Sequence, residues 1–253
     1  MVSSYIIFGV LGLCIGSFLN VLLYRLDRRG GIVTGRSECT HCHKTLAWYD
    51  LVPIVSFVAL RGRCRYCRGK ISLIYPAVEL ATALTFIAML LNLGSQGYIF
   101  LLAHVTIGAT LVSLIFFDYL YYILPDKVLI ALLIMSLFIN IYFRMDTFWY
   151  SLACGLSIAS FFGILYLVSH GTWIGFGDVK LVFIVSFLLG YPQGLLAIIL
   201  AVWLASIVGI GLIISRRASL KTALPLGSFI SIITLILITY QHGFTKIIER
   251  YYF

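Results

Sequence analysis

Long hydrophobic runs separated by short polar segments make up most of this 253-residue chain. A membrane-spanning helix needs about 20 consecutive apolar residues. Runs close to that length cover residues 5–24, 75–93, 98–117, 127–143, 148–168, 194–214 and 223–240. A shorter run at 181–190 cannot span alone, so we expect it to be extended toward Tyr191, thinned or irregular. The pattern predicts an all-α integral membrane protein with about eight transmembrane helices.

The composition agrees with this prediction and excludes a soluble globular domain. Hydrophobic residues make up 62% of the chain and charged residues 11%, whereas about a quarter of the residues in soluble domains are charged. No cluster of positive charge precedes the first run, and Arg25, Arg28 and Arg29 follow it. We therefore expect residues 1–24 to contain a retained first transmembrane helix rather than a cleaved signal peptide.

The basic residues predict how the helices are oriented. Ten of the eighteen Lys and Arg lie between Arg25 and Lys70. If residues 25–74 are cytoplasmic, the other cytoplasmic basic residues are Lys127, Lys180, Arg216, Arg217 and Lys221, and those outside are Arg144, Lys246 and Arg250. This distribution follows the positive-inside rule and places both termini on the non-cytoplasmic side. The net charge of +9 is thereby explained by topology, and we expect no nucleic acid partner, since the basic segment has no recognisable reading motif.

Three carboxylates stand in or beside the apolar runs. Asp118 follows the third long run, Asp178 precedes the short one, and Glu79 lies five residues into the second. On the predicted topology, Asp118 and Asp178 share the cytoplasmic edge of the membrane. Because an ionisable group in a membrane is costly, each is a candidate functional residue with a partner to be found.

The segment 25–74 is the only stretch polar enough for a small extramembrane domain. It contains Cys39-Thr-His-Cys42 and Cys64-Arg-Tyr-Cys67, with 21 residues between the pairs. This spacing is typical of a four-cysteine structural zinc site. Disulfides are disfavoured on a reducing cytoplasmic face, and a thioredoxin-like pair would need a βαβ context. We expect His41 and His43 to be neighbours of the metal or solvated, and Leu51–Leu60 to form a re-entrant or interfacial segment.

Several blocks of sequence together resemble one family over nearly the whole chain. They are Gly16-Ser17-Phe18-Leu19-Asn20-Val21, Arg36-Ser37, Trp48-Tyr49-Asp50, Leu60 to Cys67, Tyr75-Pro76-Ala77-Val78-Glu79, Asp118 with Leu124-Pro125-Asp126, and Gly175-Phe176-Gly177-Asp178-Val179-Lys180. In this order they are specific, and the chain resembles the type IV prepilin peptidases, also called leader peptidase/N-methyltransferases. One departure is that His43 and Lys44 stand where family members often have Gly.

The resemblance implies a GxGD-type intramembrane aspartic protease of the bacterial inner membrane. It implies cleavage of the leader of prepilins or pseudopilins at the cytoplasmic edge, and, in bifunctional members, methylation of the new N-terminus with S-adenosylmethionine. By position, Asp118 and Asp178 match the catalytic pair, and the four cysteines match the metal-binding domain. The implied domains are 1–24, a first transmembrane helix, 25–74, a zinc-binding domain associated with methyl transfer, and 75–253, a membrane peptidase domain.

The chemistry of these residues leaves several roles open. In aspartyl proteolysis two carboxylates share a proton, one activating water while the other polarises the peptide carbonyl. Gly175 and Gly177 would let the substrate backbone approach, while Lys180 would tune the pair or anchor at the headgroups. Asp126 follows a proline and is expected to be a loop or helix-start residue rather than a third catalytic acid.

Glu79 has two interpretations, as a partner for a basic residue of the zinc segment or as a carboxylate for methyl transfer or amine binding. No GxGxxG strand–helix motif is present in the sequence. A pocket for S-adenosylmethionine would therefore be of a non-Rossmann type.

Two alternatives come from other classes of protein. A proton-coupled transporter would use Asp118, Asp178 and Glu79 as a proton relay, but a relay is expected nearer the middle of the membrane and leaves the cysteines unexplained. A membrane scaffold with a zinc domain would leave the buried carboxylates without a role.

Overall fold

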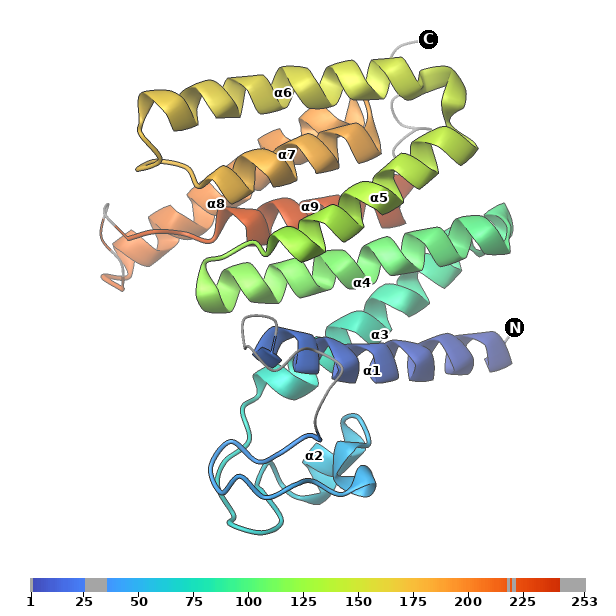
Figure 1. Cartoon of the computed structure of the whole chain (residues 1–253), viewed down its shortest axis with the longest axis vertical. Helices are drawn as coiled ribbons and strands as arrows, with labels where there is room; N and C mark the ends of the chain where they lie inside the picture. The colour runs from blue at the N-terminus through green and yellow to red at the C-terminus, as the bar shows by residue number, and fades with distance from the viewer. Residues whose placement is uncertain (1, 26–35, 218, 220–221, 242–253) are drawn as a thin grey trace. The chain divides into compact units, whose positions relative to one another are not determined.

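The computed structural model describes residues 2–25, 36–217, 219 and 222–241. Every predicted apolar run forms an α-helix (Figure 1). The helices of these runs are α1 (Val2–Arg25), α3 (Ile74–Leu93), α4 (Tyr98–Tyr121), α5 (Asp126–Phe143), α6 (Phe148–Val168), α7 (Phe176–Leu189), α8 (Gln193–Ile214) and α9 (Leu226–Thr239). No β-strand occurs within the described ranges, so the predicted all-α class is confirmed.

Six of these helices are long and apolar enough to cross a membrane, which confirms a multi-pass membrane protein. They are α1, α3, α4, α5, α6 and α8. Helices α7 and α9 have 14 residues each, or about 21 Å at 1.5 Å per residue, less than the hydrocarbon core. The predicted span 223–240 is shortened because Pro225 stands at the N-cap position of α9.

The chain divides into two compact units, Met1–Gly94 and Ser95–Phe253. The functional boundaries drawn from the sequence after residues 24 and 74 stay a prediction. The first unit holds the long helices α1 and α3, which pack side by side (Figure 1). Between them in sequence comes the cysteine-bearing segment, with a short 3₁₀ helix, η1 (Trp48–Leu51), and a one-turn helix, α2 (Val55–Ala59).

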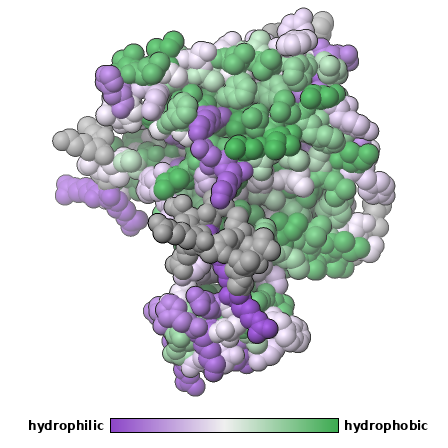
Figure 2. All heavy atoms as spheres, viewed as in Figure 1, coloured by the Kyte–Doolittle hydropathy of each residue, from purple (hydrophilic) through white to green (hydrophobic). Residues whose placement is uncertain are grey.

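Polar and apolar residues are distributed differently over the surface of the helices and of the cysteine-bearing segment. Figure 2 shows hydrophilic residues gathered on the cysteine-bearing segment, while hydrophobic residues cover much of the visible helix surface. Within the segment, the side chains of Val55 and Val58 on α2 are largely exposed. Such exposure is compatible with the predicted interfacial location of Leu51–Leu60, which stays a prediction.

The α1–α3 contact depends on two glycines spaced four residues apart on α1. A Cβ at Gly12 would lie 2.6 Å from the Cα of Ala83, and one at Gly16 would lie 2.6 Å from the Cα of Glu79. Small residues at this spacing let membrane helices approach each other closely, which provides packing where lipid gives no hydrophobic driving force. Gly16 therefore places the backbone of α1 directly against Glu79.

In the second unit, α7 is the central helix and packs against α5, α6, α8 and α9. Its residues from Leu181 to Leu189 are buried with the exception of Phe183. A helix that is apolar all round belongs in the interior of a bundle. Because α7 is surrounded mainly by protein rather than lipid, its length does not have to match the membrane.

Polar groups of α5 and of the residue after it hold the C-terminal end of α7. The side-chain amide of Asn140 donates to the carbonyl of Phe187 at 3.1 Å. The guanidinium of Arg144 donates to the carbonyl of Leu188 at 3.3 Å. Carbonyls in the last turn of a helix lack intrahelical partners, and a cation there also interacts favourably with the helix dipole.

The α1–α3 packing can be tested with the smallest possible side chain. Gly12→Ala and Gly16→Ala should each destabilise the protein by about 1–3 kcal/mol, because the added Cβ meets backbone that cannot move aside. At about 2–4 °C per kcal/mol, this predicts a fall of several degrees in the melting temperature of the detergent-purified protein. Gly211→Ala on α8, where a Cβ meets nothing within 4 Å, is the control and should not lower it. Equal melting temperatures for all three variants would contradict this packing.

Candidate active site and cysteine cluster

Asp118 is buried near the C-terminal end of α4, with an exposed fraction of 6%. Its Oδ2 accepts a hydrogen bond of 2.6 Å from the backbone N–H of Ser228, in the first turn of α9. The Ser228 hydroxyl donates in turn to the carbonyl of Ile115 at 2.9 Å. Since N–H groups in the first turn of a helix have no intrahelical acceptor and carry partial positive charge, they are suitable partners for a buried carboxylate.

Asp178 lies in the first turn of α7, two residues after its N-terminal Phe176. Its side chain is partly buried and close enough to Asp118 for a direct charge interaction between the two carboxylates. The two residues come from sequence positions 60 apart and belong to the same compact unit.

Glycines and one leucine pack tightly around the two carboxylates. A Cβ at Gly175 would lie 3.4 Å from Oδ2 of Asp178, and one at Gly227 would lie 3.2 Å from Oδ2 of Asp118. Leu124 fills the space between these loops, at 3.2 Å from a Cβ at Gly177 and 3.0 Å from one at Gly227. The glycines thus leave room beside the carboxylates that a larger residue would occupy.

Sequence reasoning missed Gly227 and Ser228, and it named Leu124 only within a block that carries the family resemblance, without a role at the site. The signal available for Gly227 and Ser228 was Pro225, since a proline just before an apolar run commonly marks a helix start, where backbone N–H groups are free to bind an anion. Leu124 had no such signal. Its role depends on which loops meet in space.

Lys180 does not contact the pair directly but forms an ion pair with Asp126. The distance from Nζ to Oδ1 is 2.6 Å, and both side chains are partly exposed to solvent. Asp126 is the first residue of α5, as the sequence predicted. The ammonium also lies 4.9 Å from the ring centroid of Phe176. Lys180 therefore joins the start of α7 to the start of α5.

The four predicted metal ligands come together in the first unit. The sulfur atoms of Cys39, Cys42, Cys64 and Cys67 all lie within 4.8 Å of one another. The Sγ atoms of Cys39 and Cys67 are 3.8 Å apart, and a tetrahedron with Zn–S bonds of about 2.3 Å has edges of about 3.8 Å. The donor set therefore fits a tetrahedral metal ion.

The surroundings lower the pKa of one of these thiols. Burial raises the pKa of the Cys39 thiol, but hydrogen bonds from the backbone N–H groups of Cys42 and His41 and from neighbouring thiols lower it to about 6. At Cys67 the backbone N–H of Gly69 lowers the pKa, but desolvation and the other thiols raise it to about 11. The thiolate is the form that binds metal. Each Cys pair is followed by a residue with positive φ, His43 at 55° and Arg68 at 58°. At the first of these positions the resemblance led us to expect Gly, which adopts such a backbone at no steric cost.

The two histidines are not members of the cluster. Nε2 of His41 is 3.3 Å from the carbonyl of Lys70. The His41 ring also packs against Gly69, where an added Cβ would lie 2.8 Å from its Cδ2 atom. Nδ1 of His43 is 3.9 Å from the carboxylate of Glu38. His41 thus connects the two cysteine loops, while His43 is exposed, in line with the roles expected from the sequence.

Glu79 belongs to the first unit, on α3, and has an exposed fraction of 7%. Its Oε2 accepts a hydrogen bond of 2.8 Å from the backbone N–H of Ile54, in the cysteine-bearing segment. One interpretation of the sequence paired Glu79 with a basic side chain of that segment. No such ion pair occurs among the described residues. Glu79 is linked to the segment by a backbone group instead.

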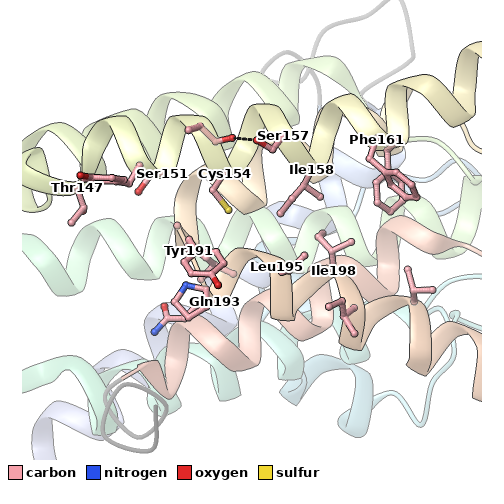
Figure 3. A pocket seen from close by; sticks show the side chains of 18 of the residues that line it. Thr147, Ser151, Cys154, Ser157, Ile158, Phe161, Tyr191, Gln193, Leu195 and Ile198 are labelled. Atoms are coloured by element: carbon pink, nitrogen blue, oxygen red, sulfur yellow. Dashed lines mark hydrogen bonds between the residues drawn. The ribbon is translucent and has the colours of Figure 1, made fainter. Parts of the chain in front are cut away.

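Each unit contains one large cavity, and the cavity of the second unit does not include the two aspartates. It has a volume of about 1290 Å³ and lies between α6 and α8, where Cys154, Ile158 and Leu195 line it (Figure 3). Most of its lining is apolar, as expected for a groove between membrane helices. The cavity of the first unit, about 1010 Å³, is lined by α1, α3 and the cysteine-bearing segment.

Comparison with known proteins gives matches over most of the chain. Residues 10–93 match the Bacterial Peptidase A24 N-terminal domain, and residues 105–214 match the Type IV leader peptidase family. Proteins named prepilin leader peptidase/N-methyltransferase are similar to the chain in Pseudomonas putida (32% identity, 88% of this chain and 86% of the relative) and Myxococcus xanthus (35%, 84% and 64%). The protein of that name in Bacillus subtilis is 29% identical over 89% of this chain and 88% of the relative.

No solved structure matches the chain. The two family matches together cover most of the chain. The relative from Pseudomonas putida is 32% identical over 88% of this chain and 86% of its own length, which decides the assignment. The expected resemblance is confirmed, and the transporter alternative gains no support from any of these matches. The chain belongs to the type IV leader peptidase family.

Proposed function

We propose that this chain is a membrane aspartic endopeptidase in which Asp118 and Asp178 cleave the leader peptide from type IV prepilins or pseudopilins. The observation that carries the proposal is the pairing of two carboxylates from α4 and α7 beside three glycines. Family membership supports the reaction class. The names of the relatives also include an N-methyltransferase, and we propose that this chain methylates the new N-terminus with S-adenosylmethionine as donor.

The hydrogen bond to Asp118 restricts where the shared proton can reside. The backbone N–H of Ser228 can only donate, so Oδ2 of Asp118 is an acceptor. The shared proton therefore resides on Oδ1 of Asp118 or on Asp178. One carboxylate then takes a proton from the attacking water while the protonated one hydrogen-bonds to the peptide carbonyl. The two groups titrate as a unit, so neither is assigned alone as the base.

We assign Gly175 and Gly177 to substrate positioning and Lys180 to holding the start of α7. The absence of side chains at the glycines would let an extended peptide approach the carboxylates. The Lys180–Asp126 ion pair links α7 to α5 on the side where Asp178 lies. Movement of α7 would move Asp178 relative to Asp118, so this ion pair would help to fix their separation.

The orientation in the membrane is proposed from the charge distribution. The excess of Lys and Arg at 25–70 places the cysteine cluster and both aspartates on the cytoplasmic side and both termini outside. The membrane would be the bacterial inner membrane. There the four thiolates would hold a structural zinc ion, which stabilises a segment too small to bury a sufficient apolar core.

Replacing either aspartate should abolish proteolysis. Asp118→Asn and Asp178→Asn keep size and polarity but remove the titratable proton, so cleavage of a purified prepilin by the full chain should fall by about 10³-fold or more. Asp146→Asn, an exposed carboxylate of the same unit, is the matched control and should cleave normally. Full cleavage by either of the first two variants would refute the pair.

Methylation should be visible in the product of cleavage. When the full chain is incubated with prepilin and S-adenosylmethionine, the mature product should gain the mass of one methylene unit at its N-terminal residue, as read by mass spectrometry. The same reaction without the donor gives the unmodified product and serves as control. Cleaved product that never gains this mass would remove methyl transfer from the proposal and leave the peptidase in place.

The cysteine cluster should bind about one zinc ion per chain. In the variant Cys39→Ser, Cys42→Ser, two of four ligands are lost, and metal analysis of the purified protein should find almost no zinc. Cys154→Ser, on α6 and outside the cluster, should retain full stoichiometry. Undiminished zinc in the double variant would show that the metal is held elsewhere.

A further inference from the structure

The cavity of the first unit is large enough for a small-molecule substrate together with a peptide end. Its volume of about 1010 Å³ is at the upper end of the range of ligand pockets. It is enclosed by α1, by the start of α3 and by the cysteine-bearing segment. Three carboxylates contribute to its lining, of which Asp50 and Glu79 are buried and Glu38 is exposed. The lining also includes the basic residues Arg25, Arg36, Arg65 and Lys70.

Glu79 is a buried carboxylate that forms no ion pair with the part of the chain that the structure describes. The groups that hydrogen-bond to it are the backbone N–H of Ile54 at 2.8 Å and the hydroxyl of Ser17. No Lys, Arg or His of the described part of the chain forms an ion pair with it. An ionised carboxylate in such a place is costly unless a positive group pairs with it. A cationic ligand entering the cavity would supply that group.

The backbone at Ile54 is strained in a way that serves this contact. Ile54 has a φ of 58° and a ψ of −48°, a conformation that is a rare outlier for a β-branched residue. Strain of this kind is retained where the surrounding structure requires it. Here the bent backbone donates its N–H to Glu79, so the segment holds the carboxylate in one position at the cavity.

Asp50 offers a second acceptor in the same cavity. Only 2% of its side chain is exposed. Oδ1 accepts a hydrogen bond of 2.8 Å from Nε of Arg65, whose guanidinium lies 4.8 Å from the ring centroid of Tyr49. Oδ2 is buried and has no hydrogen-bond partner within the described residues. A buried oxygen of this kind is expected to find a donor, and a ligand in the cavity could provide one.

We propose that this cavity is the site of methyl transfer, which rests on the function proposed above. Glu79 binds the terminal ammonium of the cleaved product and removes its proton. Oδ2 of Asp50 accepts a hydrogen bond from a polar group of the methyl donor. The inference follows from two buried carboxylates in one cavity. Among the described residues, Glu79 has no cationic partner and Oδ2 of Asp50 has no hydrogen-bond donor, and both ligands of the reaction carry positive charge and N–H or O–H donors.

The proton and electron balance of the step is complete with these groups. The ammonium gives one proton to the carboxylate of Glu79 and becomes a neutral amine. Its lone pair forms the new N–C bond to the methyl carbon, while the bond from that carbon to sulfur breaks and leaves its electron pair on sulfur. The nitrogen then carries the positive charge that sulfur has lost. Departure of the methylated product leaves Glu79 to release its proton to solvent.

The test compares Glu79→Gln and Glu79→Asp in the full-length, zinc-loaded enzyme. The Gln amide can still accept the hydrogen bond from Ile54, but it carries no charge and takes up no proton. The Asp carboxylate retains the negative charge and can take up a proton. Glu79→Gln should lower methylation by about 100-fold or more while cleavage and zinc content stay near wild type. Glu79→Asp should recover part of the methylation. Asp146→Asn removes an exposed carboxylate of the second unit, outside this cavity, and should methylate normally.

Binding measurements separate recognition of the amine from turnover. The probe is a synthetic peptide with a mature pilin N-terminus, used with a free or an acetylated amine. Wild type should bind the free amine at least about tenfold more tightly, as expected for a charged hydrogen bond, and Glu79→Gln should lose this preference. Asp50→Asn should weaken binding of S-adenosylhomocysteine by about tenfold, measured by calorimetry, without changing the peptide preference.

Several outcomes would overturn the proposal. One is wild-type methylation or an unchanged preference for the free amine in Glu79→Gln. Another is loss of zinc in both Glu79 variants, which would make Glu79 a structural residue. Unchanged binding of S-adenosylhomocysteine by Asp50→Asn would refute the proposed contact between Asp50 and the methyl donor. Failure of the proposed function is distinguishable, because wild type would then not cleave or not methylate at all.

Discussion

A carboxylate inside a membrane helix requires hydrogen-bond donors where water is scarce, and Asp118 finds one at the N-terminus of another helix. Its contact with the N–H of Ser228 requires α9 to begin beside the end of α4, which Pro225 allows. It also requires a residue without a side chain at 227, since a Cβ there would crowd both Asp118 and Leu124. The short length of α9 and its packing on α4 are thus tied to one hydrogen bond.

The position of Asp178 depends on the same bundle. It lies at the start of α7, the helix that the rest of the second unit surrounds. Lys180 and Asp126 join α7 to α5 at one end, and Arg144 and Asn140 do so at the other. A helix held at both ends keeps its first turn in place. The carboxylate pair is therefore preorganised by contacts that are mostly remote from it.

In the first unit, Glu79 is also a buried carboxylate that a backbone N–H group holds in place. Gly12 and Gly16 bring α1 against α3, and the cysteine-bearing segment lies over the cavity that these helices form. The segment reaches Glu79 through the N–H of Ile54, so folding of the cysteine loops and placement of this carboxylate are coupled. A metal ion bound by the four thiolates would stabilise both at once.

The sequence by itself determined the membrane class, the positions of the eight apolar helices, the cysteine quartet and the aspartates worth attention. These follow from local rules, because a run of apolar residues, a CxxC spacing or a charge in a hydrophobic stretch has a meaning independent of the rest of the chain. Helix ends were less predictable. Pro225 makes α9 begin later than the apolar run 223–240 predicted. Asp118 and Asp178 lie near the ends of α4 and α7, as expected from the sequence.

Only the tertiary structure decided which groups meet. It paired Lys180 with Asp126, gave Asp118 a backbone donor on α9, and linked Glu79 to Ile54 rather than to a basic side chain. It also left Oδ2 of Asp50 buried without a hydrogen-bond partner among the residues that the structure describes. Contacts between residues tens to more than a hundred positions apart depend on how helices cross and where loops turn. No local pattern in the chain encodes them, because they result from packing of the whole unit.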